Sequence, residues 1–272
     1  MRRTILITGC SSGFGAAAAR AFAASGWNVV ATARRPEDAA ALAGEPNTMV
    51  QRLDVQDIAS IEAAIATGIA RFGAIDGVVN NAGFGLLGLF EETSPDKVQE
   101  QFAVNLFGAM AVIRAVLPHF RARRSRVIVN VSSGAGVFAL PMISLYTASK
   151  FALEGFSESL AYELAGLGIR VKIVEPGGVT STRFGERSAS EAGAAARLPD
   201  YAPFLEQAEA MFGRLRVQRG RATMEEVAAV IVAAAEDPGE RLRYIATDDI
   251  RPMIALRHEA SEEAYLLSLI HI

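Results

Sequence analysis

Short runs rich in Val, Ile and Leu alternate along this chain with longer runs rich in alanine, and this alternation restricts the possible folds more than any other feature. Apolar runs bounded by glycine and polar residues are typical of buried strands, whereas the alanine-rich runs have the length of helices. Strands that are apolar along their whole length belong to parallel sheets that helices cover on both faces. We therefore predict an α/β protein with a doubly wound parallel sheet of about seven strands. The expected strands are residues 4–8, 28–33, 49–53, 77–80, 126–131, 169–174 and 242–246.

Start and stop signals place helices between these strands. Asp57 and Ser94 are side-chain acceptors of the kind that cap a helix, and Pro118 falls near the expected end of the second of these helices. Residues 182–221 break the alternation with glycine and proline among small and polar residues, and we expect a loop–helix insertion that acts as a substrate lid. The whole chain, residues 1–272, is expected to form one domain. The expected helices are residues 13–25, 37–43, 57–71, 94–117, 146–164 and 223–235, with one more within residues 249–272.

The composition excludes several classes of protein. Hydrophobic residues make up 51% of the chain and charged residues 21%, which is typical of a folded globular domain and not of a disordered chain. The net charge is −3 without any block of like charge, so neither nucleic acid nor an anionic membrane surface is an expected partner. No apolar run approaches the roughly 20 residues of a membrane span, and we expect none.

The cysteine content of the chain indicates a reducing compartment. The spacing of its histidines does not indicate a metal site. Cys10 is the only cysteine, so no intrachain disulfide can form, and the expected location is the cytoplasm. The apolar run after the first three residues is too short for the core of a signal peptide. His119, His258 and His271 lack the spacing of metal ligands, and we expect no bound metal.

A glycine-rich loop lies between the first expected strand and the first expected helix, where residues 8–15 read Thr-Gly-Cys-Ser-Ser-Gly-Phe-Gly. Glycine lets the backbone turn tightly and approach a pyrophosphate, and the N-terminus of the following helix attracts the anion. The alternative is a glycine-rich turn without a ligand. We expect dinucleotide contacts from Gly9, Ser11, Ser12, Gly13, Phe14 and Gly15.

Tyr146 and Lys150 begin a later helix four residues apart, which places both side chains on one face. A free tyrosine has a pKa near ~10, and a nearby cation lowers the pKa by favouring the phenolate. Tyr146 is thus a candidate general acid/base. The alternative is an ordinary pair of surface residues.

Polar residues also follow neighbouring strands, at the edge where open α/β sheets bind their ligands. Ser133 follows the fifth strand and could donate a hydrogen bond to a substrate oxygen, while Asn80 and Asn81 end the fourth. Asn105 stands inside an apolar helix. A buried asparagine must be hydrogen-bonded, so Asn105 is either a structural strut or part of a polar relay.

Together these residues resemble the classical short-chain dehydrogenase/reductase family. The glycine loop and Glu175-Pro176-Gly177-Gly178 look like the branch that holds retinol and 17β-hydroxysteroid dehydrogenases. The resemblance implies a Rossmann fold and an oxidoreductase that moves a hydride between a nicotinamide cofactor and an alcohol/carbonyl pair. The matching motifs, in the order and spacing of the family, are the glycine loop, Asn80-Asn81-Ala82-Gly83, Ser133, Tyr146-x-x-x-Lys150 and Pro176-Gly177.

The resemblance also implies a role for each residue. Tyr146 would donate the proton in carbonyl reduction, and Lys150 would bind the nicotinamide ribose and lower the pKa of Tyr146. Ser133 would orient the carbonyl oxygen, and Asn105 would hold a water that links Lys150 to solvent. Among three hydroxyl residues near the nicotinamide, the spacing favours Ser181 over Thr180 and Thr182. The implied cofactor contacts are Asp54, Val55, Asn81, Ala82, Gly83, Tyr146, Lys150, Pro176, Gly177, Val179 and Ser181.

The end of the second strand predicts a preference for NADP(H). An acid there would bind the ribose 2′-hydroxyl of NAD(H), whereas a 2′-phosphate requires a cation. Arg34 and Arg35 follow this strand directly, without an acid at that position. We expect Arg34 to form a fork on the phosphate, with NAD(H) as the possible alternative cofactor.

Substrate and partners are predicted more broadly. The expected pocket walls, from residues 84–87, residues 137–145 and the insertion, are mostly apolar or small and favour a hydrophobic small molecule. Extra apolar residues on the helix at 146–164 favour a homodimer or homotetramer, as the family resemblance also implies. The rival hypothesis is a catalytically silent NADP(H)-binding regulator or interaction protein. Against that rival, the sequence holds all four residues of the catalytic set, which we define as Asn105, Ser133, Tyr146 and Lys150.

Overall fold

The computed structural model describes residues 2–179, 198–218 and 222–270. Within these residues a seven-stranded sheet runs in the order β3-β2-β1-β4-β5-β6-β7, and all neighbouring strands are parallel. The strand order reverses at β1, which lies between β2 and β4. This confirms the predicted doubly wound α/β fold and places the switch point for ligand binding at the ends of β1 and β4. The strands are β1 (Thr4–Ile7), β2 (Asn28–Ala33), β3 (Thr48–Arg52), β4 (Gly77–Asn80), β5 (Arg126–Val131), β6 (Ile169–Glu175) and β7 (Arg243–Ile245).

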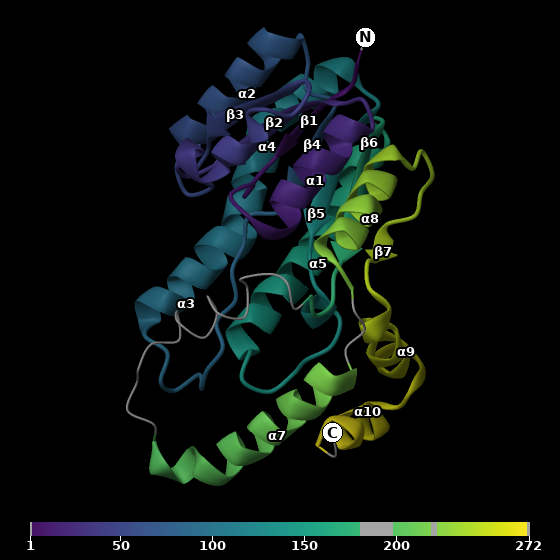
Figure 1. Ribbon diagram of the computed structural model, residues 1–272. Helices are drawn as coiled ribbons and strands as arrows, with labels where there is room; N and C mark the ends of the chain where they lie inside the picture. Colours follow the sequence, from purple (N-terminus) through teal and green to yellow (C-terminus); the bar gives the residue numbers. More distant parts are fainter. Residues whose placement is uncertain (1, 180–197, 219–221, 271–272) are drawn as a thin grey trace.

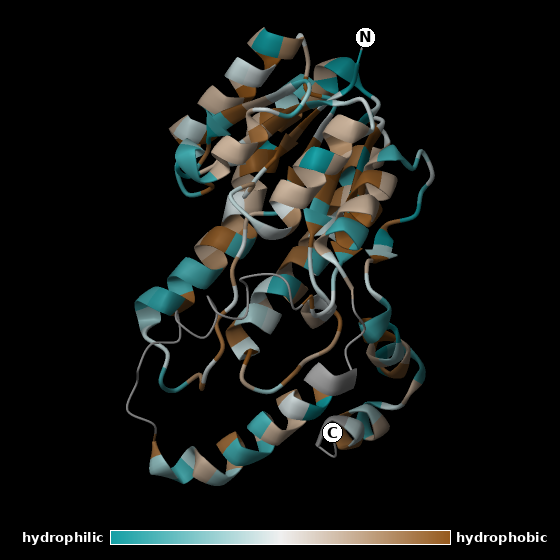
Figure 2. Cartoon of the chain, in the orientation of Figure 1, coloured by the Kyte–Doolittle hydropathy of each residue, from teal (hydrophilic) through white to brown (hydrophobic). Residues whose placement is uncertain are grey.

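Helices cover both faces of the sheet, as Figure 1 shows. Successive strand residues point to opposite faces, so Ile5 and Ile7 join one core while Leu6 joins the other. In Figure 2 hydrophobic residues predominate on the central strands, and hydrophilic residues lie on the covering helices. This is the arrangement that the apolar runs predicted. The first face is covered by α1 (Gly13–Ala24) and α8 (Met224–Glu236), and the second by α2 (Ile58–Phe72), α4 (Gly108–Arg123) and α5 (Ser144–Ala165).

The helix predicted for residues 94–117 is interrupted and extends further than expected. It consists of α3 (Pro95–Phe102), a π turn at Ala103–Phe107 and α4. The helix was expected to run to Leu117 with Pro118 near its end, but α4 contains Pro118 and continues to Arg123. Proline removes one helical hydrogen bond, but Val116 and Phe120 on either side are fully buried against the sheet and hold the helix in place.

The run from Pro95 to Arg123 is also the one stretch among the described residues that is long and apolar enough to cross a membrane. Its apolar residues have another use here. Val112 and Ile113 are buried in the core beneath the sheet. The run therefore packs as the core helix of an α/β domain does.

Three helices lie beyond the carboxyl ends of the strands. One further helix was expected within residues 249–272, and the structure has two, α9 (Arg251–Glu259) and α10 (Glu262–Ile270). β7 leads almost directly into α9, which places both helices at the carboxyl edge of the sheet (Figure 1). From the predicted insertion the structure describes a turn at Pro199–Tyr201 and α7 (Ala202–Gln218). The rest of residues 182–221, and with it most of the loop, lies outside the described residues.

Candidate active site

The glycine loop between β1 and α1 is shaped by close backbone contacts. Gly9 and Gly13 have left-handed backbone conformations, with φ of 74° and 58°, which favour glycine. A Cβ atom at Gly15 would overlap the Gly9 carbonyl oxygen and lie 2.5 Å from Asn81 Nδ2. Ser12, the N-cap of α1, makes no side-chain capping bond and is exposed. The loop therefore offers an exposed hydroxyl and the start of a helix at the switch point.

Asn81 holds this loop against the end of β4. Its Nδ2 donates hydrogen bonds to the carbonyl oxygens of Thr8 at 2.9 Å and Gly9 at 3.1 Å. The buried Thr8 hydroxyl in turn accepts from the backbone N–H groups of Asn81 and Ala82, both at 3.0 Å. The asparagine side chain is thus a brace between the glycine loop and the end of β4. Sequence reasoning missed Thr8, although its position directly before the first glycine was a usable signal.

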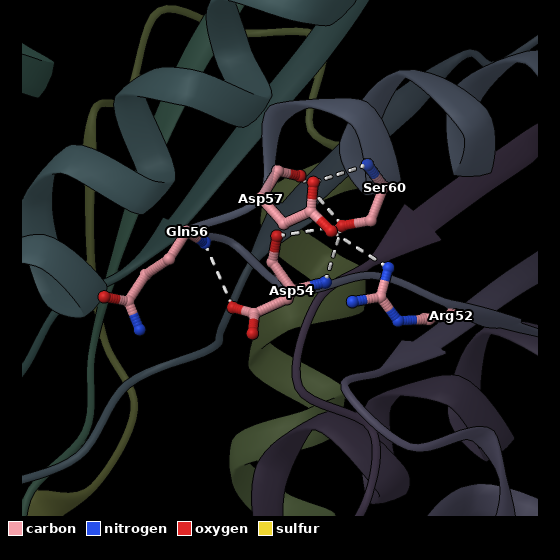
Figure 3. A network of polar contacts seen from close by, with 5 residues as sticks. All are labelled: Arg52, Asp54, Gln56, Asp57 and Ser60. Carbon is pink, nitrogen blue, oxygen red and sulfur yellow. Dashed lines mark hydrogen bonds and ion pairs between the residues drawn. The ribbon is translucent and has the colours of Figure 1, made fainter.

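Asp54 and Val55 follow β3 at the same edge of the sheet. Figure 3 shows the Asp54 carboxylate accepting from the Gln56 N–H, at 3.0 Å, while Asp57 caps α2 by accepting from the Ser60 N–H at 3.2 Å. Val55 is buried, and a Cβ at Gly108 would lie 2.7 Å from it. Val55 therefore fixes where α4 begins beneath the loop.

A polar cavity of about 410 Å³ lies at the end of β2, lined by Ser11, Arg34, Arg35 and Asp38. Asp38 forms an ion pair with Arg35 at 2.9 Å. Arg34 is exposed, and among the described residues no side chain forms a hydrogen bond or ion pair with it. Of the two arginines, Arg34 is the one whose donors face this cavity without a competing carboxylate.

Tyr146 stands in the first turn of α5, opposite the end of β5. Burial raises the pKa of its phenol to about 12, and a hydrogen bond with the Ser133 side chain lowers it. The expected net lowering of this pKa by a nearby cation is therefore not found, since burial is the larger effect. Ser133 itself is partly exposed, and its oxygen also accepts from the Ala135 N–H at 3.2 Å. The two hydroxyls meet where a substrate oxygen could reach both.

Lys150 lies one turn further along α5, on the same face as Tyr146. Its Nζ is 5.8 Å from the centre of the Tyr146 ring and donates to the Val131 carbonyl oxygen at 2.8 Å. Burial lowers the pKa of Lys150 to about 8, and the charge of Glu154 raises it. The structure thus brings together the three residues that the sequence placed on two separate elements.

Asn105 joins the loop after β4 to the start of α5. Its Oδ1 accepts from the Phe84 N–H at 3.0 Å, while its Nδ2 donates to the Phe84 carbonyl at 2.8 Å and to the Ser149 hydroxyl at 3.2 Å. Ser149 donates in turn to the Tyr146 carbonyl at 2.7 Å. These bonds make Asn105, which lies in the π turn, a structural strut, and its part in a polar relay to Lys150 stays a prediction.

The loop after β6 is held by residues that sequence reasoning missed. The Gly177 N–H donates to the Thr247 hydroxyl at 2.8 Å, and the Gly178 N–H donates to Asp249 at 3.0 Å. A Cβ at Gly177 would lie 2.5 Å from the Thr247 oxygen. Pro176 and Val179 belong to this loop, whereas Ser181, Thr180 and Thr182 lie outside the described residues. Polar residues directly after the last strand were the available signal for Thr247 and Asp249.

A second cavity, of about 520 Å³, lies beside the start of α5. Phe84 and Leu86, which were expected to line the substrate pocket, are buried. The loop after β4 contributes residues 88–91 to the cavity wall. Within the described residues no group of His, Cys, Asp or Glu is arranged to hold a metal. The cavity is lined by Gly88, Leu89, Phe90, Glu91, Met142, Ser144, Tyr201 and Phe204.

Comparison with known proteins agrees with this geometry. The family model for short chain dehydrogenase matches residues 3–192. Retinol dehydrogenase 8 of Homo sapiens is 40% identical over 66% of this chain and 60% of its own length. A short-chain dehydrogenase from Streptomyces avermitilis has a TM-score of 0.83 at 36% identity, covering 100% of this chain and 97% of its own. One from Burkholderia phymatum, in complex with NAD, has a TM-score of 0.81 at 25% identity, covering 95% and 93%.

Proposed function

The chain belongs to the short chain dehydrogenase family, and from that premise we propose that it transfers a hydride between NADP(H) and an alcohol/carbonyl pair, with Tyr146 as general acid/base. The observation that carries this proposal is the convergence of Tyr146, Ser133 and Lys150 at the carboxyl edge of the sheet. The oxidoreductase class follows from the family itself. No observation favours the rival hypothesis of a silent regulator.

The residues at the switch point fit a dinucleotide. Gly15 leaves no room for a side chain against Gly9 and Asn81, so the backbone can come close to a phosphate group. The exposed hydroxyls of Ser11 and Ser12 supply donors. When bound, the nicotinamide dinucleotide supplies or accepts the hydride, and the protein supplies alignment and charge.

In carbonyl reduction Tyr146 donates the proton. A phenol whose pKa is about 12 holds its proton near neutral pH, and the hydrogen bond with Ser133 lowers this pKa toward the range in which proton transfer is efficient. The Ser133 hydroxyl donates a hydrogen bond to the substrate oxygen and fixes its distance from the phenol. The Lys150 ammonium stabilises the phenolate that remains after the proton has left.

The test of this function is oxidation of NADPH in the presence of a panel of ketones and aldehydes of increasing apolar length. Turnover that rises with apolar length supports both the reaction and the substrate class. Cofactor binding, detected by fluorescence, without turnover on any carbonyl would favour the silent regulator.

A hydrophobic substrate is supported by the second cavity. Leu89, Phe90, Met142 and Phe204 supply most of its wall. Phe204 belongs to α7, so the described part of the insertion borders this cavity, as a substrate lid would. Retinol dehydrogenase 8 carries the name of a lipophilic alcohol, which fits this class.

Cofactor preference gives the first prediction. Replacing Arg34 with alanine should lower kcat/KM for NADPH roughly 10- to 100-fold, because hydrogen bonds to a charged phosphate contribute about 1.5–3 kcal/mol. The value for NADH should stay unchanged. Arg35→Ala is the matched control, since Asp38 already binds that side chain, and it should have a smaller effect. Wild-type protein that used NADH as efficiently as NADPH would contradict the preference.

Self-association gives the second prediction. Of the apolar residues on α5, Leu153, Leu160 and Leu164 are buried in this chain's own cores, but Phe151 and Tyr162 are 40% and 79% exposed. We propose that this outer surface of α5 pairs in a homodimer or homotetramer. Sedimentation should show a species of at least twice 28.9 kDa, and Tyr162→Glu should shift it toward the monomer. Wild-type protein that sediments only as a monomer at micromolar concentration would refute the proposal.

Location in the cytoplasm stays a proposal of the same kind. It is supported by the use of one cysteine, Cys10, which is buried. Fractionation of the cells that make the protein tests it.

A further inference from the structure

Near Lys150, the buried side chains of Glu154 and Glu175 both form ion pairs with Arg243. Glu154 lies one turn after Lys150 on α5, and Glu175 is the last residue of β6. Arg243 of β7 places its Nε 3.0 Å from Glu154 Oε2 and 3.6 Å from Glu175 Oε1. The side chains of Glu154 and Glu175 are only 7% and 2% exposed. Neither residue belongs to the motifs of the glycine loop or of the catalytic set.

The charges around this pair do not balance. Arg243 also binds the exposed Glu158 at 2.5 Å, so one guanidinium serves three carboxyl groups. Among the residues that the structure describes, the other cation whose charge acts on the pair is Lys150, which acts on Glu154. A buried carboxylate without full compensation is costly, and two like charges close together disfavour each other's ionisation.

The hydrogen-bond geometry of the two carboxyl groups points the same way. Among the described residues, neither Glu154 Oε1 nor Glu175 Oε1 has a hydrogen-bond partner of good geometry, although the Ser132 side chain lies beside Glu154. A Cβ at Gly136 would lie 2.7 Å from the Ser132 oxygen and 2.9 Å from Glu154 Cγ. The turn that follows Ser133 therefore packs closely against Ser132 and Glu154.

The surroundings of Glu154 and Glu175 affect the pKa values of the two carboxyl groups differently. Burial raises the pKa of Glu175 to about 7, the charge of Glu154 raises it further, and Arg243 lowers it. Burial also raises the pKa of Glu154, but Ser132, Arg243 and Lys150 all lower it. Both carboxyl groups therefore bind a proton more tightly than a free glutamate does, and the charge of Glu154 adds to this effect at Glu175.

We propose that Glu154 and Glu175 form a carboxyl pair that holds one proton near neutral pH, and that ionised Glu154 is a positioning residue that keeps Lys150 charged. The charge on Lys150 is what stabilises the Tyr146 phenolate, so the pair acts on the reaction only through Lys150. That last consequence rests on the proposed function, whereas the shared proton does not.

Infrared spectroscopy of the full chain tests the shared proton without any turnover. Difference spectra between pH 6 and pH 8 should show loss of a protonated carboxyl band in the wild type. Glu175→Gln should lack this band, and Glu154→Gln should shift its loss to lower pH because the neighbouring negative charge is gone. Glu158→Gln, the exposed partner of the same arginine, is the control and should keep it. A wild type without the band, or a Glu175→Gln variant that retains it, would overturn the pair.

Lys150 gives a second, independent measurement. Its Nζ can be titrated by nitrogen NMR in folded wild-type and Glu154→Gln protein. A nearby opposite charge shifts a pKa by roughly 1–3 units. Removing the charge of Glu154 should therefore lower the pKa of Lys150 from about 8 by that amount. The decline of kcat/KM with rising pH should move by the same amount, while Glu158→Gln leaves both in place. An unmoved titration in Glu154→Gln would contradict the positioning role, and a wild type without turnover would count against the proposed function alone.

Discussion

Phenylalanine in place of Tyr146 is expected to reduce kcat about 100-fold or more while NADPH affinity changes by no more than a few fold. General acid catalysis contributes typically ~10²- to 10⁴-fold, and the variant removes the only proton that the phenol can donate. The ring remains, and Lys150 keeps its hydrogen bond to the Val131 carbonyl oxygen, so the cofactor site is preserved. Single-turnover kinetics and a fluorescence titration with NADPH measure the two quantities separately.

Tyr162→Phe is the matched control for this experiment. Tyr162 lies on the same helix and is 79% exposed, so loss of its hydroxyl should leave the chemical step unchanged. A Tyr146→Phe variant that kept more than about a tenth of the wild-type rate would contradict the general-acid role. The kcat of Ser133→Ala should lie between those of Tyr146→Phe and Tyr162→Phe. This variant removes a hydrogen bond to the substrate oxygen but leaves the proton donor in place.

Asn105→Leu is expected to lower the free energy of unfolding by about 3 kcal/mol and to remove most activity. The leucine would remove the three hydrogen bonds that the Asn105 amide makes with the Phe84 N–H, the Phe84 carbonyl and the Ser149 hydroxyl, and a hydrogen bond contributes about 0.5–1.5 kcal/mol to stability. Because Ser149 bonds to the Tyr146 carbonyl, the start of α5 loses its connection to the loop after β4. Urea denaturation followed by circular dichroism measures the stability term.

Asn105→Asp separates the two halves of this strut. The aspartate can still accept from the Phe84 N–H but cannot donate to the Phe84 carbonyl or to Ser149. We expect this variant to be at least as destabilised as the leucine variant, because the buried carboxylate would be uncompensated and one of its oxygens would face the Phe84 carbonyl. A loss below about 1 kcal/mol in Asn105→Leu would show that the strut is dispensable.

The sheet could be predicted from the sequence because its central strands β1, β4 and β5 are buried along almost their whole length. β2, β4 and β5 begin and end at the residues that the apolar runs indicated, and Asp57 and Ser94 cap their helices as predicted. The continuation of α4 past Pro118 could not be predicted, since it depends on tertiary burial of the residues on either side. The second helix after β7 was missed for the same reason, because α10 packs Tyr265 against the loop that contains Ala139.

The candidate site could be predicted where the positions of its residues follow from a short segment of sequence. The spacing of Tyr146 and Lys150 fixes their common face, and the glycine loop fixes the switch point. Glu154 and Glu175 were missed because a glutamate on a helix, or at the end of a strand, is usually exposed to solvent. Only the fold brings both beside Arg243. The two sequence hypotheses for Asn105 likewise needed the position of the Phe84 loop, which no local pattern contains.

The most direct measurement of the central claim is transfer of deuterium from NADPH to a carbonyl. NADPH labelled at C4 of the nicotinamide, as each of the two C4 epimers in turn, is mixed with the protein and the most reactive carbonyl of the panel. Mass spectrometry should find deuterium on the carbinol carbon of the alcohol from one epimer only, and none of this product with Tyr146→Phe beyond about a hundredth of the wild-type rate. Bound NADPH that transfers deuterium from neither epimer to any carbonyl would contradict the assignment of this chain as a working reductase.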